Sequence, residues 1–105
     1  MKKRILLTVW LMAFATLIFG LEEEDLEKFL ATNQCVNCDL ALADLAGRNL
    51  SKARLRGADL WGAILIGADL RGAKLNGVVL DFADLEQAKF CNTTMSDGSI
   101  RNDDC

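Results

Sequence analysis

Residues 58–72 read ADLWGAILIGADLRG, which divides into three units of five with Ala first and Leu third in each unit. The same register extends in both directions, because Leu stands at every fifth position from Leu40 to Leu85 and Phe90 follows. Met95 and Ile100 are expected to extend it further. A repeat of fixed period decides a fold before local propensities do. The chain is therefore expected to be built from five-residue units.

The positions around each Leu are also restricted. The residue two places earlier is small in most units, the residue one place earlier is often Asp or Asn, and the residue two places later is often Gly. On an α-helix a period of five would spread Leu over every side, and on a flat strand it would alternate between the two sides. A coil that turns a corner once per unit keeps every Leu inside. Glycine suits such corners because they require positive φ.

The pattern over residues 38–92 resembles the pentapeptide-repeat family, whose consensus is A-(D/N)-L-x-x. The nearest matches are the units at residues 58–62, 68–72 and 83–87. The resemblance implies an all-β solenoid, a right-handed quadrilateral β-helix with four units per coil. Residues twenty apart would then stack, with coils about 4.8 Å apart, and residues 35–92 would form about three coils.

The first twenty residues have the features of a signal peptide. Three basic residues at positions 2–4 precede an apolar run to Leu21, which is short for a membrane-spanning helix. Cleavage is expected after Gly20, with a site after Ala15 as the alternative and an uncleaved anchor as a second one. Removing residues 1–20 changes the net charge from −3 to −6, since it takes away three basic residues and no acidic one.

Both ends of a β-solenoid expose strand edges, so covering segments are expected there. Residues 21–34 are predicted to form a capping helix, whose apolar side carries Leu26, Phe29 and Leu30 and whose first turn is acidic. Residues 93–105 are predicted to be a looped tail that folds back on the last coil. A turn is expected at residues 96–99, where the sequence is Ser-Asp-Gly-Ser.

The four cysteines are Cys35, Cys38, Cys91 and Cys105. A disulfide needs Cα atoms within about 7 Å, and a solenoid would hold its two ends farther apart than that. Cys91–Cys105 is therefore predicted to clamp the tail, and Cys35–Cys38 is predicted as a second bridge, with a free buried Cys38 as the alternative. A four-cysteine zinc site is disfavoured because it would need both ends to meet.

Outward positions are where any function would lie. Stacking at twenty residues gathers exposed apolar residues on one side, the candidate contact face, which comprises Leu42, Trp61, Val79 and Phe82. Ile64 and Ile66 lie on the neighbouring side. Contiguous apolar surface marks contact sites. The alternative interpretation is that the tail or the helix covers these residues, or that they are tolerated surface positions.

Two further outward features concern charge. Arg48 breaks the small-residue rule and is expected to reach past the first coil toward the acidic helix. Arg54, Arg56 and Lys74 form a short basic strip, interpreted as solvated surface rather than an anion site. The other two sides of the solenoid are expected to be mostly polar.

Composition excludes several classes of activity. The chain has no His, no Pro and no Tyr, so every catalytic pair or metal site that needs His is absent. No enzyme motif and no cofactor is predicted, and the acidic balance argues against nucleic-acid binding. The signal segment, the Cys-x-x-Cys entry and the Phe-Cys-Asn-Thr-Thr-Met ending resemble small exported pentapeptide-repeat proteins of cyanobacteria and the thylakoid lumen. That resemblance implies the periplasm or the thylakoid lumen.

We therefore expect a non-catalytic exported structural or protein-interaction protein, whose partner is another protein or a second copy of the chain. Membrane contact is expected only if the signal segment stays attached. One alternative is a DNA-mimic binder, like the family members that bind DNA gyrase. The other is a thiol redox carrier acting through Cys35 and Cys38.

Overall fold

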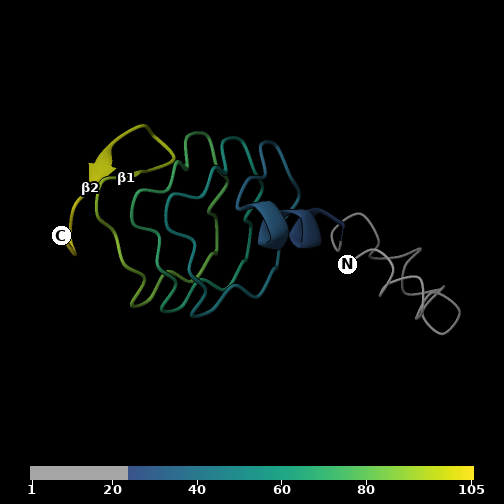
Figure 1. The fold of residues 1–105 in the computed structure, drawn as a ribbon, viewed down its shortest axis with the longest axis horizontal. Coiled ribbons are helices and arrows are strands. Elements are labelled where there is room, and N and C mark those ends of the chain that lie inside the picture. The colour runs from purple at the N-terminus through teal and green to yellow at the C-terminus, as the bar shows by residue number, and fades with distance from the viewer. Residues whose placement is uncertain (1–23) are drawn as a thin grey trace, which may run out of the picture.

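The computed structural model describes residues 24–105, so the predicted signal peptide at residues 1–20 lies outside the described residues. A helix runs over residues 24–32, and stacked turns of chain follow it to residue 92. Two short strands close the chain, β1 (Thr93–Thr94) and β2 (Ile100–Arg101). The helix and the two strands lie at opposite ends of the stack (Figure 1). No helix among residues 24–105 is long and apolar enough to cross a membrane.

The stack is a solenoid with a twenty-residue coil. Every isolated bridge is parallel and joins residues twenty apart, from Gln34–Arg54 to Lys74–Thr94. Each coil donates backbone hydrogen bonds to the next, as from Leu60 N–H to the Val79 carbonyl at 2.8 Å. Each coil also receives them, as the Ala58 carbonyl does from Val79 N–H at 3.1 Å. Four five-residue units therefore make one coil, with one unit on each side.

Leucine fills the axis of this solenoid. The leucines that are at most 2 % exposed are Leu40, Leu45, Leu50, Leu55, Leu60, Leu65, Leu70 and Leu75. Small residues two places earlier complete the core, and Ala53, Ala58, Ala68 and Ala73 are fully buried. Phe90 continues the series at 2 % exposure, but Leu80 and Leu85 are only partly buried. The leucine column is therefore fully buried from Leu40 to Leu75 and partly open at Leu80 and Leu85.

Where aspartate or asparagine precedes a Leu, it has a local role in the turn. The Asp59 carboxylate accepts a hydrogen bond from Trp61 N–H at 2.9 Å, and Asp84 accepts one from Glu86 N–H at 3.0 Å. Such side-chain bonds satisfy a backbone donor that the turn leaves unpaired. The residue after this N–H donor has positive φ. It is a glycine at some corners, such as Gly72 (φ 76°), and a larger residue at others, such as Leu42 (φ 63°).

The chain leaves the solenoid at a turn after β1. Met95 N–H donates to the Ser99 carbonyl at 2.7 Å, and β2 then runs back antiparallel to β1. Ile100 is 50 % exposed, so the expectation that it extends the buried register is wrong. The reversal carries it away from the axis, whereas Met95, before the turn, still packs against the core. Thr93 occupies an inward position, and its hydroxyl donates to the Leu70 carbonyl at 2.7 Å.

The helix at residues 24–32 contacts the first coil through one edge of its apolar side. Phe29 is 1 % exposed, and Leu26 is partly buried against the core. Leu30 is 42 % exposed, so its predicted place on the buried side is wrong. Asp25, in the acidic first turn of the helix, contacts the first coil. Its carboxylate accepts a hydrogen bond from Asp39 N–H at 2.7 Å, at the outer edge of the first coil.

Candidate functional site

The contact face defined from the sequence is exposed in the structure. Its four members are 82 % (Phe82), 63 % (Leu42), 44 % (Trp61) and 41 % (Val79) exposed. Ile64 and Ile66 lie on the adjoining side of the solenoid and are each 38 % exposed. Apolar side chains therefore occupy two neighbouring sides of the same solenoid.

Contacts between coils make this surface continuous. The rings of Trp61 and Phe82 meet edge to face, with centroids 5.5 Å apart and an interplanar angle of 65°. Leu42 lies one coil below, and its side chain occupies the space beside Gly62, where an added Cβ would approach Cδ2 of Leu42 to 2.7 Å. The absence of a side chain at Gly62 thus leaves room for the side chain of Leu42.

Neither the helix at residues 24–32 nor the tail covers the contact face, as its exposure shows. Phe29 of the helix belongs to the buried core cluster. The tail returns over Phe90, where the Arg101 guanidinium lies 3.8 Å from the ring centroid. The interpretation that one of these two segments hides the face is therefore wrong.

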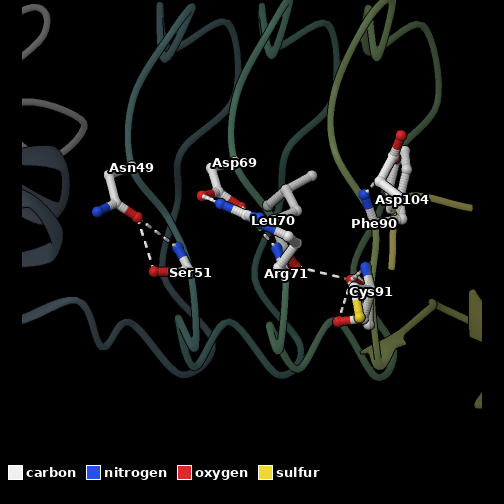
Figure 2. Close-up of polar contacts among 9 residues, drawn as sticks. Asn49, Ser51, Asp69, Leu70, Arg71, Phe90, Cys91 and Asp104 are labelled. Carbon is white, nitrogen blue, oxygen red and sulfur yellow. Dashed lines mark hydrogen bonds and ion pairs between the residues drawn. The ribbon is translucent and has the colours of Figure 1, made fainter. Parts of the chain in front are cut away.

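Polar residues occupy the other two sides. Figure 2 shows one of them, where Asn49, Asp69 and Phe90 lie on successive coils. Asp69 receives two hydrogen bonds from the Arg71 guanidinium, at 2.8 Å from Nε and 2.7 Å from Nη2. These bonds are the main reason that the pKa of Asp69 falls from 3.8 to about 2. Asp69 and Arg71 are two residues apart in the same turn, so their ion pair orders this turn locally.

The basic residues of the repeats, from Arg48 to Lys89, lie on these polar sides and are exposed. Arg54 and Lys74 are bridged neighbours on successive coils, as their grouping in one strip predicted. Arg48 is exposed too, so its charge stays in water and carries no burial cost. A DNA mimic needs a continuous acidic surface, and cations on two of the four sides do not provide one.

The cysteines are paired at the two ends of the solenoid. Cys35 and Cys38 form a disulfide with Cα atoms 5.3 Å apart, and Cys91 and Cys105 form another with Cα atoms 5.0 Å apart. Cys35 is fully buried and Cys38 is 6 % exposed. Disulfide exchange needs a thiolate to reach a sulfur, so this burial disfavours a redox carrier.

Sequence comparison identifies the repeat. A family model of pentapeptide repeats matches residues 38–77 and 65–97, with eight copies, and together these ranges cover more than half of the chain. No curated protein matches the chain.

Solved structures with similar chains come from cyanobacteria. A pentapeptide repeat protein of Cyanothece 51142 is 39 % identical, with a TM-score of 0.46 over 53 % of this chain and 42 % of that one. One from Nostoc PCC 7120 is 28 % identical, with a TM-score of 0.38 over 64 % and 73 %. HetL of the same strain, described as involved in heterocyst differentiation regulation, is 31 % identical, with a TM-score of 0.28 over 65 % and 36 %. The present chain thus spans less than half of the first and third of these proteins.

Proposed function

Because this chain belongs to the pentapeptide-repeat family, whose members fold as right-handed β-helices, we propose that it is a non-catalytic protein-interaction module that binds through its contact face. The observation that carries the proposal is the exposed aromatic pair of Trp61 and Phe82. Aromatic residues supply a large share of binding energy at protein interfaces. An exterior that only kept the solenoid soluble would not need them.

Backbone conformation supports this interpretation. Leu42 and Phe82 occupy corner positions with φ of 63° and 61°. Glycine takes this conformation without strain and stands at six other corners of the solenoid, whereas a large side chain costs about 1 kcal/mol there. Two corners of the contact face thus carry large apolar residues at a conformational cost. Lys52 and Gln87 take the same conformation at corners outside the face, so a contact function is needed to explain only why the residues at Leu42 and Phe82 are apolar and exposed.

We further propose that residues 1–20 direct export to the periplasm or the thylakoid lumen. The two disulfides support an oxidising compartment. Cell fractionation and the mass of the mature N-terminus test this proposal. A mature chain that begins at Leu21 and is found outside the cytoplasm is expected, and an intact chain in the cytoplasm would contradict it.

The architecture that serves this role is about three coils, covered at the first coil by the helix. The buried Phe29 and the bond from Asp39 N–H to Asp25 support the helix as a cap. Such a cap prevents end-to-end stacking of copies at that end. The sides of the solenoid then remain for a partner.

Affinity capture from the native compartment tests the contact face. The variant is Trp61→Ser/Phe82→Ser, and the matched control is Leu30→Ser/Ile100→Ser, which removes two exposed apolar residues from outside the face. We expect the face variant to recover at least about tenfold less partner than the wild type, with the control unchanged. Equal recovery by the face variant, at an unchanged far-ultraviolet circular dichroism spectrum, would reject the proposal.

A further inference from the structure

The third coil has an open backbone edge on two of its sides. Across residues 78–87, five N–H groups make no hydrogen bond within the described chain. Those of Leu80, Phe82, Leu85 and Gln87 lie at the positions that donate to the next coil, and the fifth is that of Asp81. Their counterparts one coil earlier are all bonded, at 2.8 Å from Leu65 N–H to the Asp84 carbonyl and 2.9 Å from Gly62 N–H to the Asp81 carbonyl. The turn at residues 96–99 removes the chain that would have continued the ladder here.

The rest of this end is closed by the tail. Phe90 N–H donates to the Asp104 carboxylate at 2.8 Å, and Asn92 N–H donates to the Asn102 side chain at 2.8 Å. The disulfide to Cys105 fastens this part of the tail beside Cys91. The N–H groups of Phe90 and Asn92 on the next side are therefore bonded, whereas the corresponding N–H groups within residues 78–87 are open.

Side chains along the open edge are apolar and acidic. Phe82 is 82 % exposed, and Leu80 and Leu85 are only partly buried. Asp81, Asp84 and Glu86 are exposed, and residues 78–87 contain no Lys or Arg. Unpaired donors, apolar surface and a single sign of charge thus coincide in one segment.

We propose that residues 78–87 form a docking edge for an extended cationic segment of a partner protein, which adds to the solenoid as a further strand. This inference rests on the proposed function and names the class of partner. Strand addition supplies main-chain hydrogen bonds for affinity and side-chain contacts for specificity. The three acidic side chains repel a second copy that presents the same edge and attract Lys and Arg of a partner.

The chain itself shows the bonds that such a segment makes. β1 and the residues after it lie beside the unit at residues 73–77 and receive hydrogen bonds from Leu75 N–H to Thr94 at 2.8 Å and from Gly77 N–H to Ser96 at 3.0 Å. Thr94 N–H donates in return to the Ala73 carbonyl at 2.9 Å. A partner beside residues 78–82 would receive bonds from Leu80 and Phe82 N–H and donate one to the Val78 carbonyl. The next side of the solenoid, at residues 83–87, repeats this pattern.

Amide hydrogen exchange measured by NMR tests the proposal on protein recovered from the periplasm of an expression host with both disulfides formed. The probe is a blocked nine-residue peptide in which lysine alternates with valine and threonine. At a peptide concentration ten times the dissociation constant, we expect about tenfold slower exchange at the four open amides. One control peptide carries glutamate in place of lysine, and the other carries N-methyl groups along one backbone edge. Neither peptide should protect these amides.

Charge reversal at the edge provides the protein control. Glu86→Lys is compared with Ala46→Lys, two coils earlier in the same column and in the same turn, since Ala46 N–H donates to Asp44 as Glu86 N–H does to Asp84. Glu86→Lys should weaken peptide binding about threefold to fivefold, and Ala46→Lys should not. Equal effects of the two variants would overturn the cationic preference.

Other outcomes separate this proposal from the proposed function. Peptide binding that changes the NMR chemical shifts of the Trp61 and Phe82 rings without protecting the open amides rejects strand addition. Such a result does not contradict binding through the contact face. Sedimentation that shows a dimer, together with protection of the open amides in the absence of peptide, identifies a second copy as the occupant and overturns the cationic partner. No binding of the peptide at millimolar concentration rejects the proposal, while capture through the contact face is judged by its own experiment.

Discussion

Asp104 satisfies both backbone groups of Phe90. Its N–H donates to the Phe90 carbonyl at 2.7 Å, and its carboxylate accepts the Phe90 N–H at 2.8 Å. Figure 2 shows the two residues side by side at the last coil. One tail residue therefore supplies the acceptor that a further coil would have given to Phe90 N–H. It also bonds the Phe90 carbonyl, whose counterpart at Leu70 accepts from Ala73 N–H within the same coil.

Removal of the Asp104 carboxylate should loosen this end of the solenoid. Asp104→Ala leaves Phe90 N–H without its acceptor and is expected to lower the free energy of unfolding by about 1 kcal/mol. Urea unfolding measures the loss, and hydrogen exchange at Phe90 locates it. Asp81→Ala is the control, because the Asp81 side chain is exposed at an uncovered edge, and its effect should stay within about 0.5 kcal/mol. Equal effects of the two variants would contradict the role assigned to Asp104.

The two disulfides should differ in their contribution to stability. Cys91–Cys105 closes a loop across 14 residues and Cys35–Cys38 one across 3. The chain-entropy model gives about 3 kcal/mol for the longer loop and about 2 kcal/mol for the shorter one. Paired Cys→Ala variants, Cys91→Ala/Cys105→Ala and Cys35→Ala/Cys38→Ala, compared by denaturant unfolding test this order. A larger loss at the shorter loop would show that burial of Cys35 matters more than loop closure.

Gly62 should be sensitive to substitution because of Leu42. Gly62→Ala and Gly47→Ala both place a side chain at positive φ, but only Gly62 has Leu42 in the way, while Gly47 has open space. Each change should cost about 1 kcal/mol from backbone strain, with an additional cost at Gly62. A double-mutant cycle with Leu42→Ala isolates the additional cost. A coupling energy of zero would mean that Leu42 moves aside freely.

Acid should remove the stabilisation supplied by the Asp69–Arg71 pair. The hydrogen bonds from Arg71 lower the pKa of Asp69 from 3.8 to about 2. A carboxyl group with a lowered pKa stabilises the fold above its unfolded pKa, and this stabilisation is lost as the pH falls through the folded value. The stability difference between wild type and Asp69→Asn should therefore shrink between about pH 4 and pH 2.

An NMR titration of the Asp69 carboxyl measures this shift directly. In Arg71→Ala the pKa of Asp69 should return toward 3.8, since the guanidinium is its main cause. The pair is partly exposed, so added salt should reduce the shift. If the titration midpoint of Asp69 does not change in Arg71→Ala, its low pKa is caused by a group other than Arg71.

The pentad register could be predicted because it is local and repeated. Each buried Leu from Leu40 to Leu75 has nearly the same surroundings, so one period settles the direction of all of them. The family prediction is confirmed by the match over residues 38–97. The exposure of Trp61 and Phe82 followed from the same register. Their ring contact across two coils did not, since it depends on rotamers at a corner with positive φ.

The ends of the solenoid could not be predicted in this way. Ile100 fits the period but is exposed, because the turn at residues 96–99 reverses the chain. Leu30 fits the helix pattern but is exposed, because the apolar contact of the helix with the core is made by Phe29 and Leu26. Asp25 and Asp104 both sit in acidic runs of sequence, and nothing local marks them as the residues whose carboxylates accept backbone N–H groups.

The sequence by itself therefore determined the coil, its core and the side on which the apolar residues gather. A period of five admits one geometry in which every Leu is inside, and that geometry fixes the direction of each side chain between the ends. Only the tertiary structure decided how the ends are closed and that residues 78–87 keep an open edge. The path of the tail depends on long-range contacts that no repeat specifies, because each of these contacts occurs only once in the chain.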